Sequence, residues 1–422
     1  MVEPRIIPRA AHIVSRRDID PDALKVLYRL RQAEHIAYLV GGSVRDLLLG
    51  RRPKDFDIGT SAHPYQVKKL FRNCWIIGRR FRLAHVRFGT KVIEVATFRR
   101  QVGPGEEVVH DGVPAPDPST PEGQHLVHHD NTFGTPEEDA FRRDFTINAL
   151  FYDIADFSVI DYVGGLDDLG ARIVRSIGDP DVRLVEDPVR MLRAIALAAR
   201  LDFRIEPALH QAIRRHRHEI AKASPPRMLE EYYKILRAGS AETAFRQLAD
   251  VGLLEPTSPE LHRGATQTLW RSLAAVDAYR RRFDSTPESL SNAILLGSLL
   301  APLGVSVSHS RDAAPPRLGP LPLARRDIEQ IRQIWALQRR LRDLDASPRA
   351  QRALAHRHIF SDALTWLEIH GQAPKLVEHW KAVTPEPATV AEHAHHAHGQ
   401  EGDERPFRRR RRRRRRRFTT TP

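Results

Sequence analysis

The sequence predicts an α+β fold, in which a small mixed α/β sheet is followed by a long all-α region. Short apolar or alternating runs, such as IAYLV at residues 36–40 and KVIEVATF at residues 91–98, are typical of buried strands. From about residue 170 to 382 the chain instead repeats helical patterns such as DPVRMLRAIALAARL. The chain has 422 residues, more than one hydrophobic core usually organises, so we expect at least two folded domains.

The elements of the sheet region follow one another closely. Residues 21–34 have near-helical apolar spacing, and the strand that follows them ends at Gly41 and Gly42. The pattern then predicts a short helix in SVRDLLLG, a turn at Pro53 and extended structure in KDFDIGT. A helix over residues 63–71 follows, with extended segments in WIIG and AHVRFG and the strand over residues 91–98. Beyond these we expect a long loop over residues 101–136 and a hairpin near residues 158–165.

We divide the chain into five segments. They are an N-terminal arm and helix (residues 1–36), a head that holds the sheet (37–168), a helical neck (169–240), a helical body (241–382) and an arginine-rich tail (383–422). The tail contains ten consecutive arginines, Arg408 to Arg417, which cannot fold by packing on one another. We therefore predict that the tail is disordered.

The charge of the chain indicates a polyanionic partner such as nucleic acid. Lys and Arg number 67 against 53 Asp and Glu, which gives a formal net charge of +14, and the pI is about 10.3. The tail holds 11 Arg and 5 acidic residues, hence +6, so the remaining +8 belongs to residues 1–382. The body of the protein is therefore basic as well.

The single cysteine, Cys74, excludes internal disulfides and any multi-cysteine zinc or iron-sulfur site within one chain. The N-terminal residues have no apolar core of the kind that a signal peptide needs, and no run of about eighteen apolar residues occurs. We expect a cytoplasmic protein with no membrane partner.

Two aspartates two positions apart, Asp55 and Asp57, are the first candidate site. In a strand both side chains project from the same face, where two carboxylates repel one another unless a cation lies between them. Mg²⁺ prefers carboxylate oxygens and completes its shell with water and substrate phosphates. The alternative is an exposed strand end with two solvated charges.

Neighbouring residues favour a phosphate ligand and a third carboxylate. Gly41 and Gly42 offer backbone N–H groups and room for a phosphate, and Arg45 adds a guanidinium suited to phosphate oxygens, although the glycines could form a plain turn. Glu94 interrupts an apolar strand, and a charge there needs a cation or solvent. If its strand neighbours the Asp57 strand, three carboxylates converge and can hold two Mg²⁺.

Four segments, taken in order, resemble the signature motifs of one family. They are LVGGSVRDLLLGRRPKDFDI, IEVATFR, EEDAFRRDFTINAL and EDPVRMLRAIALAARL, and the resemblance extends from roughly residue 8 to 240. The family is that of the bacterial class II nucleotidyltransferases, the poly(A) polymerases and CCA-adding enzymes. The resemblance implies a head with the DNA polymerase β-like nucleotidyltransferase fold, followed by helical neck and body domains.

The resemblance also implies a role for each matching residue. It makes Asp55 and Asp57 the metal ligands and Glu94 the third catalytic carboxylate. It places Gly42 and Arg45 at the triphosphate, Arg142 or Arg143 at the phosphates, Asp144 and Asn148 at the ribose, and Asp187 and Arg190 at the base. Gly41 and Arg193 are further candidate nucleotide-binding residues.

Local patterns agree with these roles but leave structural alternatives open. A helix beginning near Asp144 would put Asp144 and Asn148 on one face, where Asp144 is also a candidate accessory catalytic acid; alternatively Asp144 caps that helix and Asn148 is buried. Asp187 has the position of an N-cap, with Pro188 as the first helical residue. The alternative for Asp187 is a capping role alone, with solvated arginines beyond it.

The branch of the family depends on residues outside these motifs. IIGRRFRLAHV at residues 76–86 resembles the segment that marks the poly(A) polymerases, and its Arg79 and Arg80 could follow an RNA backbone. The tail, from Arg408 to Arg417, should attract RNA through contacts that do not depend on base sequence. The alternatives are a basic loop without a special contact and a tail that only anchors RNA.

We therefore expect a polynucleotide adenylyltransferase that adds AMP from ATP to the 3′ ends of RNA, messenger and small RNAs included, with two Mg²⁺ or Mn²⁺ ions. We also expect a monomer that works with RNA-degradation machinery. One alternative is a CCA-adding tRNA nucleotidyltransferase. A non-catalytic RNA-binding protein with the same fold is another, although it predicts the loss of at least one carboxylate, and all three are present.

Overall fold

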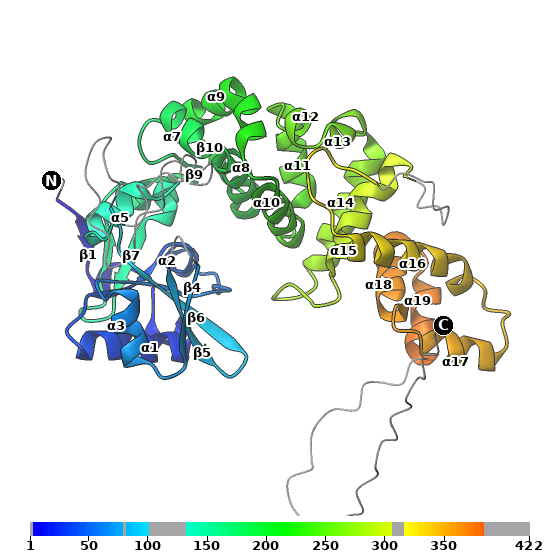
Figure 1. The fold of residues 1–422 in the computed structure, drawn as a ribbon, viewed down its shortest axis with the longest axis horizontal. Helices are drawn as coiled ribbons and strands as arrows, with labels where there is room; N and C mark the ends of the chain where they lie inside the picture. The colour runs from blue at the N-terminus through cyan, green and yellow to red at the C-terminus, as the bar shows by residue number, and fades with distance from the viewer. Residues whose placement is uncertain (1–2, 79–81, 101–131, 306–315, 384–422) are drawn as a thin grey trace, which may run out of the picture. The chain divides into compact units, whose positions relative to one another are not determined.

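One mixed sheet organises the head in this computed structural model, and the structure describes residues 3–78, 82–100, 132–305 and 316–383. The strand order is β1-β8-β7-β2-β3-β6-β5-β4, with β3 and β6 parallel and the other described neighbours antiparallel. The strands are β1 (Arg5–Ile7), β2 (Ala37–Val40), β3 (Asp57–Thr60), β4 (Cys74–Ile77), β5 (Leu83–Phe88), β6 (Lys91–Thr97), β7 (Leu150–Asp153) and β8 (Val159–Asp161) (Figure 1). The predicted mixed sheet is confirmed, whereas the hairpin expected near residues 158–165 lies earlier, because β8 pairs with the preceding strand β7.

Two helices cover one face of this sheet. Both α1 (Pro21–Gln32) and α3 (Pro64–Leu70) contact the strands, and the side chains beneath them include Leu39, Ile58 and Val95. Because neighbouring positions along a strand point to opposite faces, Asp57 and Glu94 belong to the other face. The apolar core thus lies on one side of the sheet and the predicted acidic residues on the other.

A glycine and a phenylalanine shape the acidic face. Phe98 packs so closely over Gly59 that a Cβ there would lie 2.5 Å from its ring. Phe98 also belongs to a small buried cluster with Val40 and Phe151, next to the strand ends. This cluster supports the sheet where β2, β3 and β7 approach the candidate site.

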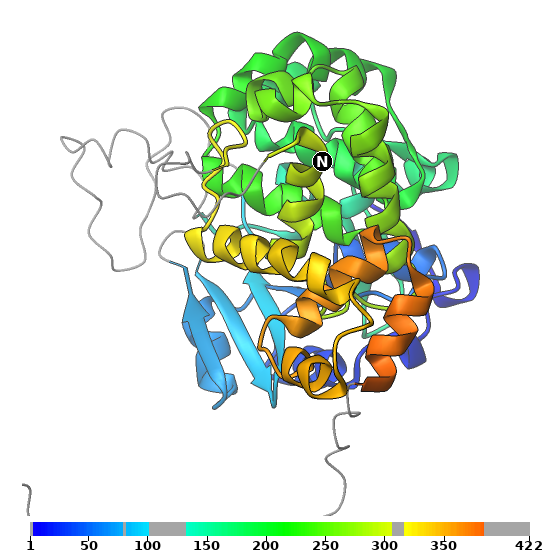
Figure 2. The same cartoon turned by 90° about the vertical axis from the view of Figure 1, so that its right-hand side faces the viewer.

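The rest of the described chain is mainly helical. The elements that follow the first strands of the head are α2 (Gly42–Leu48), α5 (Pro136–Arg142), α6 (Gly165–Ala171), α7 (Pro180–Glu186), α8 (Val189–Leu201), α9 (Pro207–His216), α10 (Pro225–Arg237), α11 (Ala241–Asp250), α12 (Leu254–Thr257), α13 (Pro259–Arg263), α14 (Gln267–Arg280), α15 (Asn292–Leu300), α16 (Arg325–Leu341), α17 (Pro348–Ala355), α18 (Phe360–His370) and α19 (Pro374–Val383), with short 3₁₀ turns between some of them. In Figure 2 the group of α16, α18 and α19 is coloured yellow to orange. No helix of the described residues has the length and apolar character that crossing a bilayer requires.

Two predicted elements differ from the structure. The helix expected to begin near Asp144 is instead a 3₁₀ turn, η4 (Thr146–Asn148), because Phe145 is extended and its backbone bridges to Ser176. The predicted all-α region also contains two short parallel strands, β9 (Ile173–Val174) and β10 (Arg204–Ile205). Each of these strands follows a helix that ends in a left-handed residue, which turns the chain into extended structure.

Candidate active site

Two carboxylates lie side by side at the edge of the acidic face. The parallel pairing of Ile58 with Val95 puts Asp57 and Glu94 one residue earlier on adjacent strands, so both point to the same side. Asp57 is also the register partner of Val40, the last residue of β2 before the Gly41 turn. The sequence-based expectation that the Glu94 strand neighbours the Asp57 strand is therefore confirmed.

The electrostatics of Asp57 show that this negative charge is poorly compensated. Loss of hydration, together with repulsion by Glu94 and Asp55, raises the pKa of the Asp57 carboxyl to about 6, although Arg143 acts in the opposite direction. All three carboxylates are nevertheless exposed to solvent. Three neighbouring carboxylates, one of them with a raised pKa, form an environment that a divalent cation would stabilise.

The donor set fits Mg²⁺ better than a metal held by protein alone. Within the described ranges, no three His, Cys, Asp or Glu side chains are already arranged as a metal site. Mg²⁺ typically binds one or two carboxylates and fills its remaining positions with water and substrate phosphates. Asp55 and Asp57 supply such carboxylate oxygens, so the residues present fit the ion.

The glycine turn brings an arginine to the carboxylates. Gly41 has a φ of +72°, and a Cβ at this position would lie 3.0 Å from Nη1 of Arg143. The same Arg143 nitrogen donates to the backbone oxygen of Asn148, 3.2 Å away. Glycine is thus required at position 41 both for the backbone conformation and for the approach of Arg143.

Asn148 connects several predicted nucleotide-binding residues. Its side-chain oxygen accepts a hydrogen bond from Arg45, and its amide nitrogen donates to Oδ1 of Asp144 at 3.2 Å. Arg45 itself is buried, is paired with Asp46 at 2.7 Å, and has its pKa lowered by burial. Asp144 and Asn148 therefore meet as predicted, although a 3₁₀ turn and not a helix brings them together.

An ion pair joins the head to the neck at Asp144. This buried carboxylate lies 2.7 Å from Nη2 of Arg193 on α8, and its charge raises the pKa of the Arg193 guanidinium. Arg190, one turn earlier on α8, instead contacts Glu186 at 3.1 Å and the backbone oxygen of Arg183. The two arginines of the predicted base-recognition motif thus have different partners.

Asp187 is displaced by one residue from its predicted position. Helix α8 begins at Val189 with Pro188 as its N-cap, while Asp187 closes the end of α7. The N-cap prediction for Asp187 is therefore wrong by one residue, because the helical backbone begins only at Pro188. Its side chain still accepts from the Val189 N–H at 3.4 Å and pairs with Arg227 at 2.7 Å.

Two residues that sequence reasoning missed hold the arginines of the third motif. Asp139 is buried and accepts from both Arg142 and Arg143, which outweigh the effect of burial and lower its pKa. Arg183 donates to the backbone oxygens of Arg142 and Arg143. The spacing of Asp139 from the two arginines, three and four positions along a helix, was the available signal.

The RNA-binding candidates Arg79, Arg80, Arg408 and Arg417 lie outside the described residues. Within the described part of the same poly(A) polymerase-like segment, His85 is the register partner of Glu94, with Nε2 3.6 Å from a carboxylate oxygen. His85 therefore shares the acidic face with Glu94.

The head thus combines a mixed sheet with a charged face, and comparison with known proteins shows what it resembles. Residues 37–175 match the family model described as "Poly A polymerase head domain", and residues 202–264 match "Probable RNA and SrmB- binding site of polymerase A". Residues 317–417 match "Polymerase A arginine-rich C-terminus". Over these three segments the chain is similar to the poly(A) polymerases.

Individual relatives agree with this assignment. Poly(A) polymerase I of Salmonella typhimurium is 51% identical over 263 residues, which are 62% of this chain and 55% of that protein. The CCA-adding enzyme of Lactobacillus johnsonii is 36% identical over 233 residues, 55% of this chain and 54% of that protein. The chain thus spans about half the length of these curated relatives.

A solved structure supports the fold over most of the chain. The CCA-adding enzyme of Bacillus stearothermophilus in complex with CTP is 27% identical, with a TM-score of 0.62, over 86% of this chain and 82% of that one. This likeness extends beyond the head into the helical region.

Proposed function

We propose that the chain is a template-independent polynucleotide adenylyltransferase, which transfers AMP from ATP to RNA 3′ ends. The observation that carries this proposal is the pair Asp57 and Glu94, placed on one face of adjacent strands with insufficient positive charge around them. Such a site binds divalent cations and, through them, a triphosphate.

Each of the three carboxylates would have its own role in the transfer of AMP. The RNA 3′-OH attacks the α-phosphorus of ATP and loses its proton to solvent as the new P–O bond forms. The bond from that phosphorus to the oxygen that bridges to the β-phosphate breaks, and pyrophosphate leaves with its electron pair. Two Mg²⁺ ions at Asp55 and Asp57 would supply the charge that activates the hydroxyl and steadies the leaving group. Glu94 would orient the 3′-OH and accept its hydrogen bond.

Nucleotide recognition would use the network around Asn148. Gly41, Gly42 and Arg143 would contact the phosphates, with Arg142 and Arg45 nearby, while Asp144 and Asn148 would test for the ribose hydroxyls. Because Arg45 is buried and bonded to Asn148, we assign it the role of holding Asn148 in place. Preformed contacts of this kind reduce the ordering that substrate binding requires.

The adenine would be recognised from the neck. Asp187, Arg190 and Arg193 lie on or beside the first turns of α8, and Arg193 is tied to Asp144 in the head. Base choice by fixed side chains would make the enzyme independent of a template. The metal ions and the roles of these three residues are parts of the proposal.

Poly(A) addition is favoured over CCA addition by the difference in similarity. The chain is 51% identical to a poly(A) polymerase and 36% identical to a CCA-adding enzyme over segments of comparable length. We propose messenger and small RNAs as substrates, a monomeric enzyme, and a role with RNA-degradation machinery.

One assay separates these functions. The purified protein is incubated with unstructured RNA or with tRNA lacking its 3′ end, each with ATP alone or with CTP plus ATP, and the products are resolved on a sequencing gel. A long ladder of A residues on unstructured RNA is expected. Addition that stops after three nucleotides on tRNA would show a CCA-adding enzyme, and absence of pyrophosphate with every RNA would favour a binding protein.

A further inference from the structure

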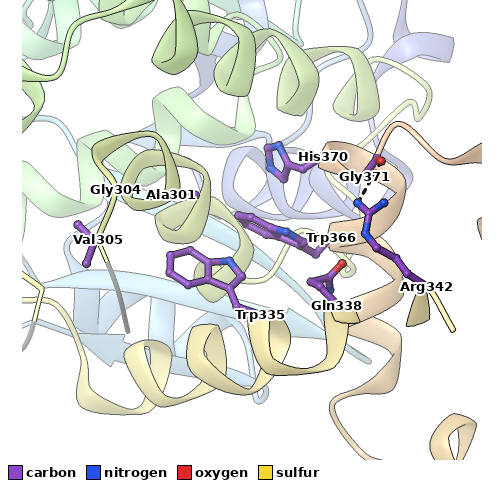
Figure 3. Close-up of a pocket in the computed structure, with 9 residues that line it drawn as sticks. All are labelled: Ala301, Gly304, Val305, Trp335, Gln338, Arg342, Trp366, His370 and Gly371. Atoms are coloured by element: carbon purple, nitrogen blue, oxygen red, sulfur yellow. Dashed lines mark hydrogen bonds between the residues drawn. The ribbon is translucent and has the colours of Figure 1, made fainter. Parts of the chain in front are cut away.

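The helical body contains an open cavity that none of the residues discussed so far line. Its volume is about 540 Å³, and it lies between the end of α15, the N-terminal part of the following loop, α16 and α18 (Figure 3). Protein interiors rarely leave voids larger than a water molecule, whereas ligand sites commonly have this size. The lining residues are Ala301, Gly304, Val305, Trp335, Gln338, Arg342, Trp366, His370 and Gly371.

Three aromatic rings line this cavity. Trp335 on α16 and Trp366 on α18 meet edge to face, with ring centroids 5.7 Å apart, and Trp366 in turn contacts His370 at 4.3 Å (Figure 3). Trp366 is buried, while Trp335 is partly exposed. Trp335 thus presents aromatic surface that the protein itself does not cover.

Close packing fixes the position of the inner ring. A Cβ at Gly297 on α15 would lie 2.8 Å from the ring of Trp366, so α15 approaches that ring as closely as a glycine allows. On the other side, Nε2 of His370 is 2.9 Å from Oγ of Ser298. Burial lowers the pKa of His370 to about 4, so the ring is neutral at physiological pH and adds aromatic surface without charge.

The polar groups of the cavity suit a base attached to a phosphate. The indole N–H of Trp335 is buried and has no hydrogen-bond partner among the residues that the structure describes, so the exposed part of this side chain is its apolar ring surface. Arg342 is exposed and donates to the backbone oxygen of Gly371 at 3.3 Å through one of its nitrogens. Residues 325–342 contain six arginines and two acidic residues, a local charge of +4 that favours a polyanion.

We propose that this cavity is a stacking site for a base of the single-stranded RNA substrate, with Trp335 as its platform and Arg342 beside the adjoining phosphate. The inference rests on the proposed function, because the strand is the one whose 3′ end is extended. Every base has a π face, so stacking on an aromatic side chain holds RNA without selecting its sequence. Such a contact suits an enzyme that accepts many different RNAs.

A base in this cavity can belong to a free nucleotide or to an RNA strand, and the positive charge of α16 favours the RNA strand. A mononucleotide brings its phosphates to a single point, whereas the phosphates of a strand extend along the helix and interact with its whole positive charge at longer range. Competition with ATP distinguishes the two sources.

Photochemical cross-linking tests the contact directly. RNA that carries 5-bromouridine is irradiated with the full-length protein at about 0.3 M salt, where charge interactions beyond a few ångströms are screened, and the linked peptide is identified by mass spectrometry. We expect Trp335 to be linked, and excess ATP to leave the yield unchanged. Links that avoid residues 301–371 altogether, or loss of the Trp335 link with ATP, would overturn the proposal.

Kinetics with matched variants provide the second test. In Trp335→Ala the KM for RNA should rise roughly 5- to 150-fold, the measured range for losing one stacked base, while kcat and the KM for ATP stay unchanged. Trp335→Phe retains a ring and should stay closer to the parent protein. Equal RNA KM values in Trp335→Ala and the parent protein would contradict a stacking role.

The charge contact has its own control on the same helix. Arg342→Ala should reduce the slope of log affinity against log salt by about 0.7, the value for one phosphate of a single strand. Arg339→Ala removes the same charge from an exposed residue that does not line the cavity and should change that slope less. Equal slopes in the two variants would count against a phosphate at Arg342. If the parent protein extends no RNA, the proposed function fails, while cross-linking still reports on the cavity.

Discussion

Two groups of carboxylates in the head have opposite surroundings. Asp57 and Glu94 on adjacent strands, and Asp55 two residues before the start of β3, are exposed, and the pKa of Asp57 is raised. Asp139 and Asp144 are buried, and the pKa of Asp139 is lowered by its two arginines. Loss of hydration acts to raise the pKa of Asp57 and of Asp139 alike, so the two arginines at Asp139 account for the difference between these two residues.

This comparison distinguishes carboxylates that could bind a metal ion from carboxylates that hold arginine side chains in place. The buried group is already neutralised by Arg142, Arg143 and Arg193, so it holds those arginines in position and has no charge to offer a metal. The exposed group lacks this compensation and gains most from an added cation. Arg143 belongs to both, because it pairs with Asp139 and also weakens the repulsion at Asp57.

The largest effect is expected from removing a carboxylate of the exposed group. Asp57→Asn or Asp55→Ala should lower AMP incorporation on the order of a thousandfold or more, since charge stabilisation by a bound metal contributes several kcal/mol. Pyrophosphate release measures the loss, and circular dichroism shows whether the fold is retained.

A control for this loss lies elsewhere in the head. Asp167→Asn removes an equal charge from an exposed side chain that pairs only with Arg5 among its described partners, and it should leave activity unchanged. Normal extension by Asp57→Asn would rule out the proposed metal site.

A large stability effect is expected from the buried group. Asp139→Asn leaves Arg142 and Arg143 without their counter-charge and should destabilise the fold by about 3 kcal/mol, the lower end for breaking a buried ion pair because both arginines are partly exposed. Urea unfolding measures the change against Asp167→Asn, for which little change is expected. A change no larger than that of the control would show that Asp139 does not hold the arginines.

The sequence predicted the exposed group better than the buried one. Asp57 and Glu94 follow from alternation along strands, a local rule, and their meeting required only that β3 and β6 be neighbours. The partners of the buried group come from distant segments: Arg193 lies 49 positions from Asp144, and Arg183 lies 40 from Arg143. No periodic pattern specifies such contacts.

The same distinction explains the wrong local predictions. The segment after Arg142 has helical spacing, yet Arg183 takes the carbonyl groups of Arg142 and Arg143, and Phe145 bridges to Ser176. Hydrogen bonds to distant segments therefore determine the backbone conformation here, although local propensity favours a helix. The cavity at Trp335 could not be predicted from the sequence either, because a half-buried tryptophan on α16 has the spacing of a core residue.

A moderate effect is expected at the turn that connects the two groups. Gly41→Ala forces a side chain onto a φ of +72° and against Arg143, and should destabilise the fold by about 1–3 kcal/mol. Gly50→Ala is the matched control, since its φ is +65° but its Cβ would meet nothing within 4 Å. Only Gly41→Ala should also raise the KM for ATP, because only there does Arg143 have to move. Equal KM values for ATP in the two variants would show that Arg143 does not contact the nucleotide.

The smallest expected effect is a pH dependence that differs in sign between the two groups. In metal-free protein the pKa of Asp57 rises from its ordinary value of 3.8 to about 6, so the folded state binds this proton more tightly than the unfolded state. Its contribution to stability is complete below pH 3.8 and is lost as the pH rises through 6. Asp139, with its lowered pKa, instead contributes stability that is lost as the pH falls.

The difference between parent protein and Asp57→Asn isolates the exposed group. The parent should lose up to about 1 kcal/mol relative to the variant between about pH 3.8 and pH 6, a small value because the carboxylate is open to solvent. Urea midpoints measured without and with Mg²⁺ test this, and added Mg²⁺ should restore the parent above pH 6, since a metal competes with the proton for the same oxygens. If Mg²⁺ stabilises Asp57→Asn as much as the parent, the ion binds elsewhere. The opposite pH dependences of Asp57 and Asp139 would then no longer distinguish a metal-binding carboxylate from one that holds arginines in place.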